Sequence, residues 1–500
     1  MTEHAPEAAP EAAPRADRKG AALASLSRVW AQASGGVLLL VASAVLTPTV
    51  FGEYVLAMSF FALLQLFAGS GVYEYVLRER ESKAAPMTAI ILNMCTSGAA
   101  LGVMMLASLF ADRLFHSTHI GDLMRLLAPA MLLQGANLVL ETVLLRRAQV
   151  TRVSVVMIVS DGLGMALAVA GLHFGGGAAA LVLQKLGREG ALLIGYAACA
   201  GVSRPIGPDF GEAVRMARFA TGIIGTRLLG QGANTSLDML IGAILNPAAA
   251  GLFRLANRLI GMAFDILHFP MRTMMWVTLP PLRHDPAAFS QTLLRMAATY
   301  SVLLCACIAG IGVIAPTAFP LLFKPEWQPV VPIIAIMAAA RLLVWPGSLM
   351  EQLLAIRNDI RLLIGWEIMN FTLGVGMLAI FAHYGLTAAA VSQLAAAFIS
   401  QLVTLPLIAK KAPLPYLGLL SLVGRLWGLV FLMTGAVLAW LALANSLAVN
   451  AWLTLALGVL IGAAVYAGAA ARIVPEGMEA YFSAARAIFA KARGALRAAS

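Results

Sequence analysis

The sequence predicts an all-α integral membrane protein of about 14 transmembrane helices, built as two pseudo-symmetric six-helix lobes plus two extra C-terminal helices, with both termini cytoplasmic. Composition, long apolar segments and an internal repeat predict this fold class. Hydrophobic residues make up 60% of the 500 residues, charged residues only 12%, and the mean hydropathy is +0.85. Because so few charges cannot cover a water-facing surface of this size, the chain is expected to lie in a bilayer, which excludes a soluble enzyme.

The sequence lacks the motifs of common catalytic and metal sites. It contains no HExxH, no CxxC pair and no Gly-rich phosphate loop after a strand pattern. Its four cysteines lie inside apolar runs, where they are typical of small hydrophobic residues: Cys95, Cys199, Cys305 and Cys307. We therefore expect no catalytic residue, no metal site and no bound cofactor.

The two ends of the chain are expected to lie outside the membrane. Residues 1–22 form an Ala/Pro/Glu tract followed by a basic patch, which cannot bury enough surface to order the chain and is predicted to be a disordered tail. The apolar stretch that follows lacks a small-residue cleavage site, so it is interpreted as a first spanning helix and not as a signal peptide. Residues 475–500 are basic and weakly amphipathic, and they are predicted to form a cytoplasmic tail on the inner leaflet.

Fourteen segments of the chain reach the roughly 20 apolar residues that a spanning helix needs. They are residues 25–47, 54–77, 87–110, 123–145, 153–172, 178–201, 216–245, 248–270, 293–316, 330–356, 362–384, 386–408, 422–444 and 450–471. The predicted domains are an N-terminal six-helix lobe, a C-terminal six-helix lobe and a pair of extra helices, over residues 23–205, 206–410 and 411–474.

The distribution of Lys and Arg predicts the orientation, because cytoplasmic loops are enriched in these residues. With the N-terminus inside, 26 of the 35 basic residues lie in inside segments, and only Arg113, Arg125 and Lys324 lie outside. Every inside connection then carries at least two basic residues. The net charge of +11 is therefore mostly a topology signal and not the footprint of a nucleic-acid-binding protein.

The chain also matches itself without gaps at an offset of 199 residues, across the first and seventh spans. The identical pairs that chance explains least are Arg28 with Arg227, Gln32 with Gln231, Pro48 with Pro247 and Gly52 with Gly251. Six spans separate the two copies, an even number, so both halves enter the membrane in the same direction. This repeat is typical of a two-bundle transporter with its site between the halves.

Three patches of the chain, in order, carry a family resemblance. They are PTVFGEYVLAMSFFALLQLFAGSGVYEYVLRER (48–80), SLDMLIGAILNPAAAGLFRLANRLI (236–260) with the following LPPLRHDPAAF (279–289), and FKPEWQPVVPIIAIMAAARLL (323–343). They resemble Wzx-type polysaccharide flippases, the polysaccharide-transporter branch of the multidrug/oligosaccharidyl-lipid/polysaccharide superfamily. The resemblance implies two six-helix lobes that form a V and export polyprenyl-pyrophosphate-linked sugar repeat units by alternating access.

Ionisable residues inside the spans are the candidate functional groups, because each costs a few kcal/mol unless it faces a cavity or a partner. The charges near the midplane are mostly positive, which suits a pyrophosphate group, and the resemblance implies cavity arginines on the first and eighth spans. The predicted substrate-binding residues are Arg28, Lys185, Arg188, Arg227, Arg254, Arg258 and Arg341. The predicted carriers of a coupling proton or sodium ion are Asp161, Glu189 and Asp238.

Alternatives to these site assignments remain open at the level of sequence. Lys185 and Arg188 could pair only with Glu189 and Asp161 and so be purely structural. The polar stripe of the seventh span could bond one lobe to the other, and Trp327 is interpreted as an interfacial-belt residue more readily than as a sugar-stacking platform.

The leading hypothesis is a non-enzymatic transporter of lipid-linked oligosaccharide in the bacterial inner membrane, for surface or exopolysaccharide biosynthesis. Membrane lipids, a polysaccharide polymerase and the export machinery are its expected partners, and nucleic acid is not. One alternative is a multidrug or cation antiporter of the same superfamily, which the excess of midplane cations disfavours. The other is a polyprenyl-dependent membrane glycosyltransferase or polymerase, which the short external loops disfavour.

Overall fold

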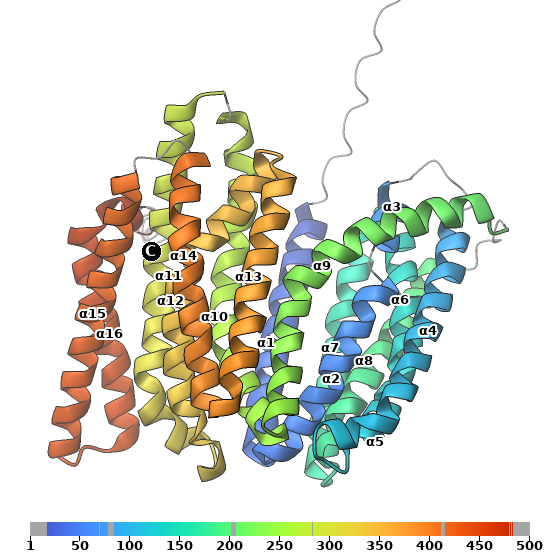
Figure 1. The fold of residues 1–500 in the computed structure, drawn as a ribbon, viewed down its shortest axis with the longest axis horizontal. Coiled ribbons are helices and arrows are strands. Elements are labelled where there is room, and N and C mark those ends of the chain that lie inside the picture. The colour runs from blue at the N-terminus through green and yellow to red at the C-terminus, as the bar shows by residue number, and fades with distance from the viewer. Residues whose placement is uncertain are drawn as a thin grey trace, which may run out of the picture.

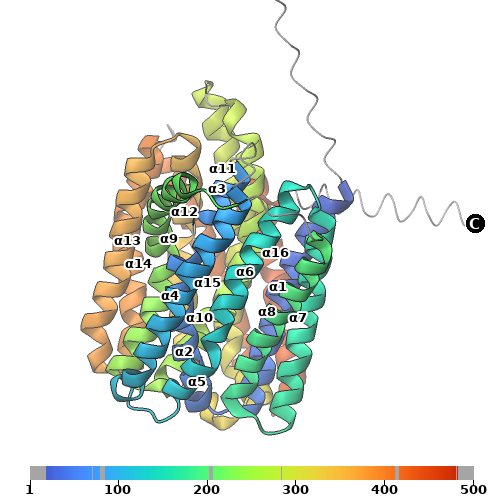
Figure 2. The same ribbon diagram turned by 90° about the vertical axis from the view of Figure 1, so that its right-hand side faces the viewer.

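A computed structural model of the chain describes residues 18–69, 71–78, 85–201, 207–282, 284–411, 416–479, 481 and 483. Every regular element in this described part is a helix, and the long helices run roughly side by side in one bundle (Figures 1 and 2). Residues 1–17 of the predicted N-terminal tail, and most of the predicted C-terminal tail, lie outside the described residues.

The first half of the bundle contains eight helices in the described residues. They are α1 (Arg18–Val45), α2 (Pro48–Gly69), α3 (Val72–Arg78), α4 (Ala85–Leu114), α5 (Ile120–Leu127), α6 (Pro129–Arg146), α7 (Val150–His173) and α8 (Gly177–Ala200). Helix α1 begins inside the segment predicted as a tail, so the prediction is wrong for residues 18–22. The last proline before it is Pro14, and the Arg, Lys, Gly and Ala residues from Arg18 onward are mostly strong helix formers.

The second half also contains eight long helices in the described residues, joined by three short 3-10 turns. The helices are α9 (Phe210–Ile244), α10 (Pro247–Thr278), α11 (Pro286–Leu322), α12 (Val330–Ile356), α13 (Ile360–Phe381), α14 (Leu386–Lys411), α15 (Tyr416–Ser446) and α16 (Ala451–Ile473). The last two pack on each other and against α11, at the edge of the bundle farthest from α4 (Figure 1). The first half of α9 crosses the upper end of the N-terminal half, and the rest descends in the middle of the molecule (Figure 1).

Ten helical segments of the described chain are long and apolar enough to cross a membrane. A shorter apolar segment of α1, Val29–Val45, joins them. Besides α1, the long helices that fall short are α8, α9 and α10, which carry most of the ionisable residues predicted for the site. The same charges that mark these helices as functional therefore lower their hydropathy.

The two copies of the internal repeat meet each other at the lower end of the bundle in Figure 1, where α2 and α10 begin. Each helix starts with a proline, Pro48 or Pro247, a residue suited to the first helical turn. A Cβ atom on Gly52 would lie 1.7 Å from the Pro247 carbonyl oxygen, and one on Gly251 would lie 2.4 Å from the Pro48 carbonyl oxygen. The repeated Pro and Gly residues thus let the two helix starts approach backbone to backbone.

A second contact joins the two halves at this end. Trp327, in the turn between α11 and α12, donates from Nε1 to the carbonyl oxygen of Leu46 at 3.1 Å, and Lys324 donates from Nζ to that of Val45 at 2.9 Å. Both carbonyls lie where α1 ends, so the two side chains cap unsatisfied acceptors. The Trp327 side chain is fully buried and stacks edge-on against Phe51, so its interpretation as an interfacial-belt residue is wrong.

The close approach of α2 and α10 makes Gly52→Ala a sensitive test of this interface. The added methyl group meets a backbone oxygen that cannot rotate away, so we expect a loss of about 1–3 kcal/mol of stability, as in other overpacked sites. Gly98→Ala in α4 is the matched control, because a Cβ there meets nothing within 4 Å. The thermal unfolding temperature should fall for Gly52→Ala and not for Gly98→Ala, and equal values for both would contradict the contact.

Candidate functional site

Of the ten residues predicted for the site, nine have described side chains. The exception is Arg28, which lies on α1 but whose side chain lies outside the described part. The other nine separate into three groups: a network on α7 and α8, two ion pairs that involve α9, and two arginines with no carboxylate partner.

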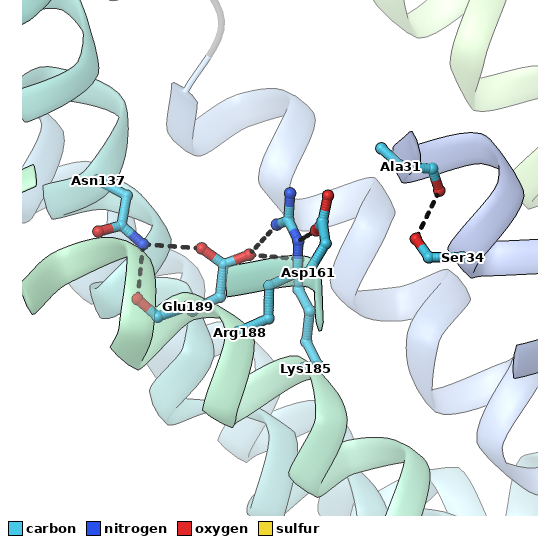
Figure 3. A network of polar contacts seen from close by, with 7 residues as sticks. All are labelled: Ala31, Ser34, Asn137, Asp161, Lys185, Arg188 and Glu189. Carbon is cyan, nitrogen blue, oxygen red and sulfur yellow. Dashed lines mark hydrogen bonds and ion pairs between the residues drawn. The ribbon is translucent and has the colours of Figure 1, made fainter. Parts of the chain in front are cut away.

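The network on α7 and α8 centres on Glu189 (Figure 3). The Oε1 atom of Glu189 accepts from Lys185 Nζ at 2.8 Å and from Arg188 Nη1 at 2.9 Å, and its Oε2 accepts from Asn137 Nδ2 of α6 at 2.8 Å. Arg188 also pairs with Asp161 of α7 through Nε. The helical spacing of Lys185, Arg188 and Glu189 puts all three on one face, as the sequence predicts.

Two cations and two carboxylates balance in this network, and all four side chains are largely shielded. The exposed fraction is 1% for Glu189 and 6% for Asp161, against 14% for Lys185 and 21% for Arg188. The Lys185 ammonium also lies 5.1 Å from the centre of the Phe61 ring, a cation–π distance. Because the network neutralises itself, its two cations do not need an external anion.

A small cavity separates this network from α1. It has a volume of about 250 Å³, and Ala31, Ser34 and Gly35 of α1 line it opposite Asp161 and Arg188. Figure 3 shows Ala31 and Ser34 of α1 on one side and the charged network of α7 and α8 on the other. Asp161 keeps one carboxylate oxygen, Oδ2, without a hydrogen-bond partner among the described residues.

Two further predicted cations are also paired. Arg254 of α10 donates to the carboxylate of Asp238 of α9 at 2.8 Å, and Asp238 is fully buried. Arg227 of α9 pairs with Glu74 of α3, so this bond ties the second half of the molecule to the first. The predicted stripe on the seventh span is therefore engaged, through Arg227 and Asp238, in contacts that hold helices together.

Arg258 and Arg341 form the third group, because neither makes an ion pair with a carboxylate in the described part of the chain. Arg258 of α10 donates from Nη2 to Gln32 Oε1 of α1 at 2.9 Å, across the two halves. The Arg341 guanidinium of α12 lies 5.3 Å from the centre of the Phe264 ring of α10. Asp265, on α10 after Arg258, interacts electrostatically with both arginines at longer range. Arg258 thus reaches from α10 to α1 across the interface between the halves, and Arg341 reaches from α12 to α10.

Arg341 also lines a cavity of about 230 Å³ in the second half of the molecule. The polar groups around it are mostly amides, from Asn234 of α9, Asn257 of α10, Asn370 of α13 and Gln393 of α14. No carboxylate lines this cavity within the described residues.

A larger, almost wholly apolar groove of about 580 Å³ runs between α11 and the α15–α16 pair. It is lined by residues such as Ile311, Phe319, Val437 and Gly462, and it extends to Leu40 of α1 and Leu259 of α10. The extra C-terminal helices therefore form one wall of a groove that reaches the helices of the site.

Sequence reasoning missed three groups that organise the site. Glu74, which pairs with Arg227, lies near the end of the second predicted span, and no sequence pattern connects the two residues. Asn137 and Asn257 are uncharged polar residues of α6 and α10, and helical spacing does not connect them to groups on other helices. Their roles depend on contacts between helices far apart in the sequence, for which no local pattern is a signal.

Comparisons with known proteins agree with this architecture. The family model of polysaccharide biosynthesis proteins matches residues 42–332, which is more than half of the chain. The succinoglycan biosynthesis transport protein ExoT of Rhizobium meliloti (strain 1021) is 23% identical over 306 residues, which cover 61% of this chain. The match spans 62% of that relative's length, less than two thirds.

Two groups of solved structures share the fold. The lipid II flippase MurJ in an inward closed conformation superposes with a TM-score of 0.71 at 11% identity, covering 90% of this chain and 98% of MurJ. An inward-facing multidrug resistance MATE family transporter superposes with a TM-score of 0.63 at 14% identity, covering 78% and 98%. The family match over residues 42–332 and the three sequence patches agree: the chain belongs to the polysaccharide biosynthesis protein family, and its helices adopt the fold seen in MurJ and MATE transporters.

Proposed function

We propose that the protein moves polyprenyl-pyrophosphate-linked oligosaccharide repeat units from the inner to the outer leaflet of a bacterial inner membrane, by alternating access and without covalent chemistry. The observation that carries this proposal is the presence of two shielded cations, Arg258 and Arg341, neither of which makes an ion pair with a carboxylate in the described chain. An uncompensated cation inside a membrane protein costs several kcal/mol unless an anion joins it. A pyrophosphate group supplies that anion and suits the forked geometry of guanidinium groups.

The apolar groove beside α15 and α16 supports a lipid-linked cargo. A polyprenyl chain gains about 0.8 kcal/mol for each CH₂ group that it buries away from water, but it can as well stay in the bilayer. A groove of about 580 Å³ that reaches Leu40 and Leu259 would keep the chain beside the two arginines while the head group crosses. The relative ExoT, a succinoglycan biosynthesis transport protein, is consistent with a saccharide cargo.

Alternating access is supported by the contacts between the two halves. At the lower end in Figure 1 they are closed by the Gly52–Gly251 approach and by Trp327, and near the opposite end Arg227 pairs with Glu74. During an export cycle the contacts at the lower end in Figure 1 would open and form again. The close backbone approach at Gly52 and Gly251 is therefore part of the moving interface.

We also propose that α1, α8, α9 and α10 cross the membrane with the ten more apolar segments, which makes fourteen spans with both termini cytoplasmic. These four helices are as long as their neighbours and pack between them. In a chain whose four native cysteines are replaced by alanine, a membrane-impermeant thiol reagent should label Phe174→Cys, in the α7–α8 turn, in intact cells. It should label Gln149→Cys, in the α6–α7 turn, only after the cells are permeabilised. Labelling in the reverse order would overturn the orientation.

Transport against a gradient needs a coupling ion, and we propose a proton or sodium ion at Asp161, Glu189 or Asp238. Each of these carboxylates is already paired with a cation, so an incoming ion competes with an internal salt bridge. Asp161 has the spare oxygen and lines a cavity, which favours it over the other two.

The experiment that tests the proposed function is an analysis of polyprenyl-linked saccharides in a strain that lacks this protein. We expect a complete repeat unit to accumulate on the inner leaflet and the surface polymer to be lost. Unchanged lipid-linked saccharides together with increased sensitivity to cationic drugs would favour a multidrug antiporter with the same fold.

A further inference from the structure

The two halves of the molecule contain cavities in equivalent places. Ser34, Gly35 and Leu38 of α1 line the cavity of the first half, and their partners at the 199-residue offset, Ala233, Asn234 and Leu237 of α9, line that of the second. A second constant offset relates the remaining walls: Asp161 to Asn370, Gln184 to Gln393 and Arg188 to Ala397. The cavities are therefore a repeated feature of the fold with different side chains.

Those differences give the two cavities different chemistry. In the first half, Arg188 pairs with both Asp161 and Glu189, so the charged groups of this cavity neutralise one another. In the second half, alanine replaces the arginine and an amide replaces the carboxylate, at Ala397 and Asn370. The space that a paired arginine fills in one half is left open in the other.

The amides of the second cavity are only partly used within the protein. Asn370 donates from Nδ2 to the carbonyl oxygen of Trp366 at 2.9 Å and accepts from Ser400, and Gln393 donates from Nε2 to the carbonyl oxygen of Gly374 at 2.9 Å. Asn234 and Asn257 have no hydrogen-bond partner among the described residues, and both line the cavity. An unpaired amide beside a cavity offers one acceptor and two donors to a ligand.

Arg341 also lines this cavity. If its guanidinium holds the pyrophosphate, as the proposed function requires, the sugar bonded directly to that pyrophosphate must lie beside it. Sugar hydroxyl groups both donate and accept hydrogen bonds, which matches free asparagine amides and not an ion-paired network. At about 230 Å³, the cavity exceeds the ~30 Å³ share of one water several-fold, yet it lies below the ~300 Å³ at which pockets for drug-sized ligands begin.

We infer that the cavity between α9, α10, α12, α13 and α14 binds the first sugar of the cargo, the one joined to the pyrophosphate, with Asn234 and Asn257 as the residues that recognise its hydroxyl groups. This inference rests on the proposed function, and it names one sugar and not the whole repeat unit. Selectivity for saccharide-bearing over bare carrier would then arise in the second half of the molecule, while the first half keeps a self-neutralised counterpart.

Two probes separate sugar recognition from anion recognition: bare polyprenyl pyrophosphate, and the lipid-linked saccharide extracted from cells that lack this protein. Binding of each to the purified full chain is measured for the wild type, Asn234→Leu and Asn257→Leu. We expect each substitution to weaken binding of the saccharide-bearing lipid about three- to tenfold, the range for one or two neutral hydrogen bonds, and to leave binding of the bare lipid unchanged.

Asn445→Leu, at the exposed end of α15, is the matched control and should bind both lipids like the wild type. Equal losses for both lipids in the Asn234 and Asn257 variants, or no loss for either, would overturn the sugar site while the proposed function stands. Failure of the wild type to bind either lipid would instead overturn the proposed function, and this inference with it. The thermal unfolding temperature of each variant shows that a loss of binding is not a loss of folding.

Discussion

Replacing Arg258 or Arg341 with glutamine is expected to lower export of the lipid-linked saccharide about 10- to 100-fold while the protein still accumulates in the membrane. A hydrogen bond to a charged group contributes about 1.5–3 kcal/mol, and each 1.4 kcal/mol is a factor of ten. Neither arginine makes an ion pair with a carboxylate in the described chain, and Asp265, which interacts with both at longer range, keeps one of them in either variant, so we expect the protein to fold. Surface polymer and inner-leaflet saccharide, both normalised to the amount of protein, measure the effect.

Two controls sharpen this expectation. Arg125→Gln removes an exposed arginine that pairs with Asp122 away from the site, and it should export normally. Arg258→Lys and Arg341→Lys keep the charge but lose the forked donor pair, so intermediate export is expected if the group bound is a phosphate. Normal export by both glutamine variants would show that anion binding by these arginines is not part of the transport mechanism.

Glu189→Ala is expected to have the opposite phenotype: the protein should fail to accumulate, and so lose export only as a consequence. Glu189 is the shared acceptor of Lys185, Arg188 and Asn137, and only 1% of its side chain is exposed. Removing one partner of a buried ion pair costs about 3–5 kcal/mol, because the remaining charge has no counterion. Membrane abundance and the thermal unfolding temperature are the measurements.

A compensating pair of substitutions separates structure from transport. Lys185→Met combined with Glu189→Gln removes one cation and one anion together and keeps an acceptor for Asn137, so abundance should recover. If the α7–α8 network is structural, export should recover with it. Normal abundance and stability of Glu189→Ala without export would show instead that Glu189 acts in the transport cycle.

The element boundaries show what hydropathy alone could and could not predict. The predicted span 386–408 agrees closely with α14, which runs from Leu386 to Lys411. The predicted span 216–245 begins too late, since α9 starts at Phe210 behind the N-cap Asp209, whose side chain accepts from Gly211 N. The first turns of this helix are polar, so an apolar window does not include them although capping makes them helical.

The repeat was predictable in its residues but not in its contact. The shared Pro and Gly residues at the 199-residue offset indicate two related halves. Only the structure brings Gly52 against Pro247 and Gly251 against Pro48, because two copies of one motif can meet only when the halves pack face to face. The same packing buries Trp327, which a one-dimensional reading assigns to the lipid interface.

The sequence by itself determined that this protein lies in a membrane, that its halves are related, and that its ionisable residues gather on a few helices. These properties depend on composition and on spacing along the chain. The length of an apolar segment decides whether it can cross a bilayer, and helical spacing decides which residues share a face. The tertiary structure alone decided which cations are free. Among the described residues, Lys185, Arg188, Arg227 and Arg254 each make an ion pair with a carboxylate, and Arg258 and Arg341 do not. Most of those carboxylates lie on other helices, and a charge inside a membrane protein is neutralised by whatever lies within a few ångströms in space, whatever its distance along the sequence.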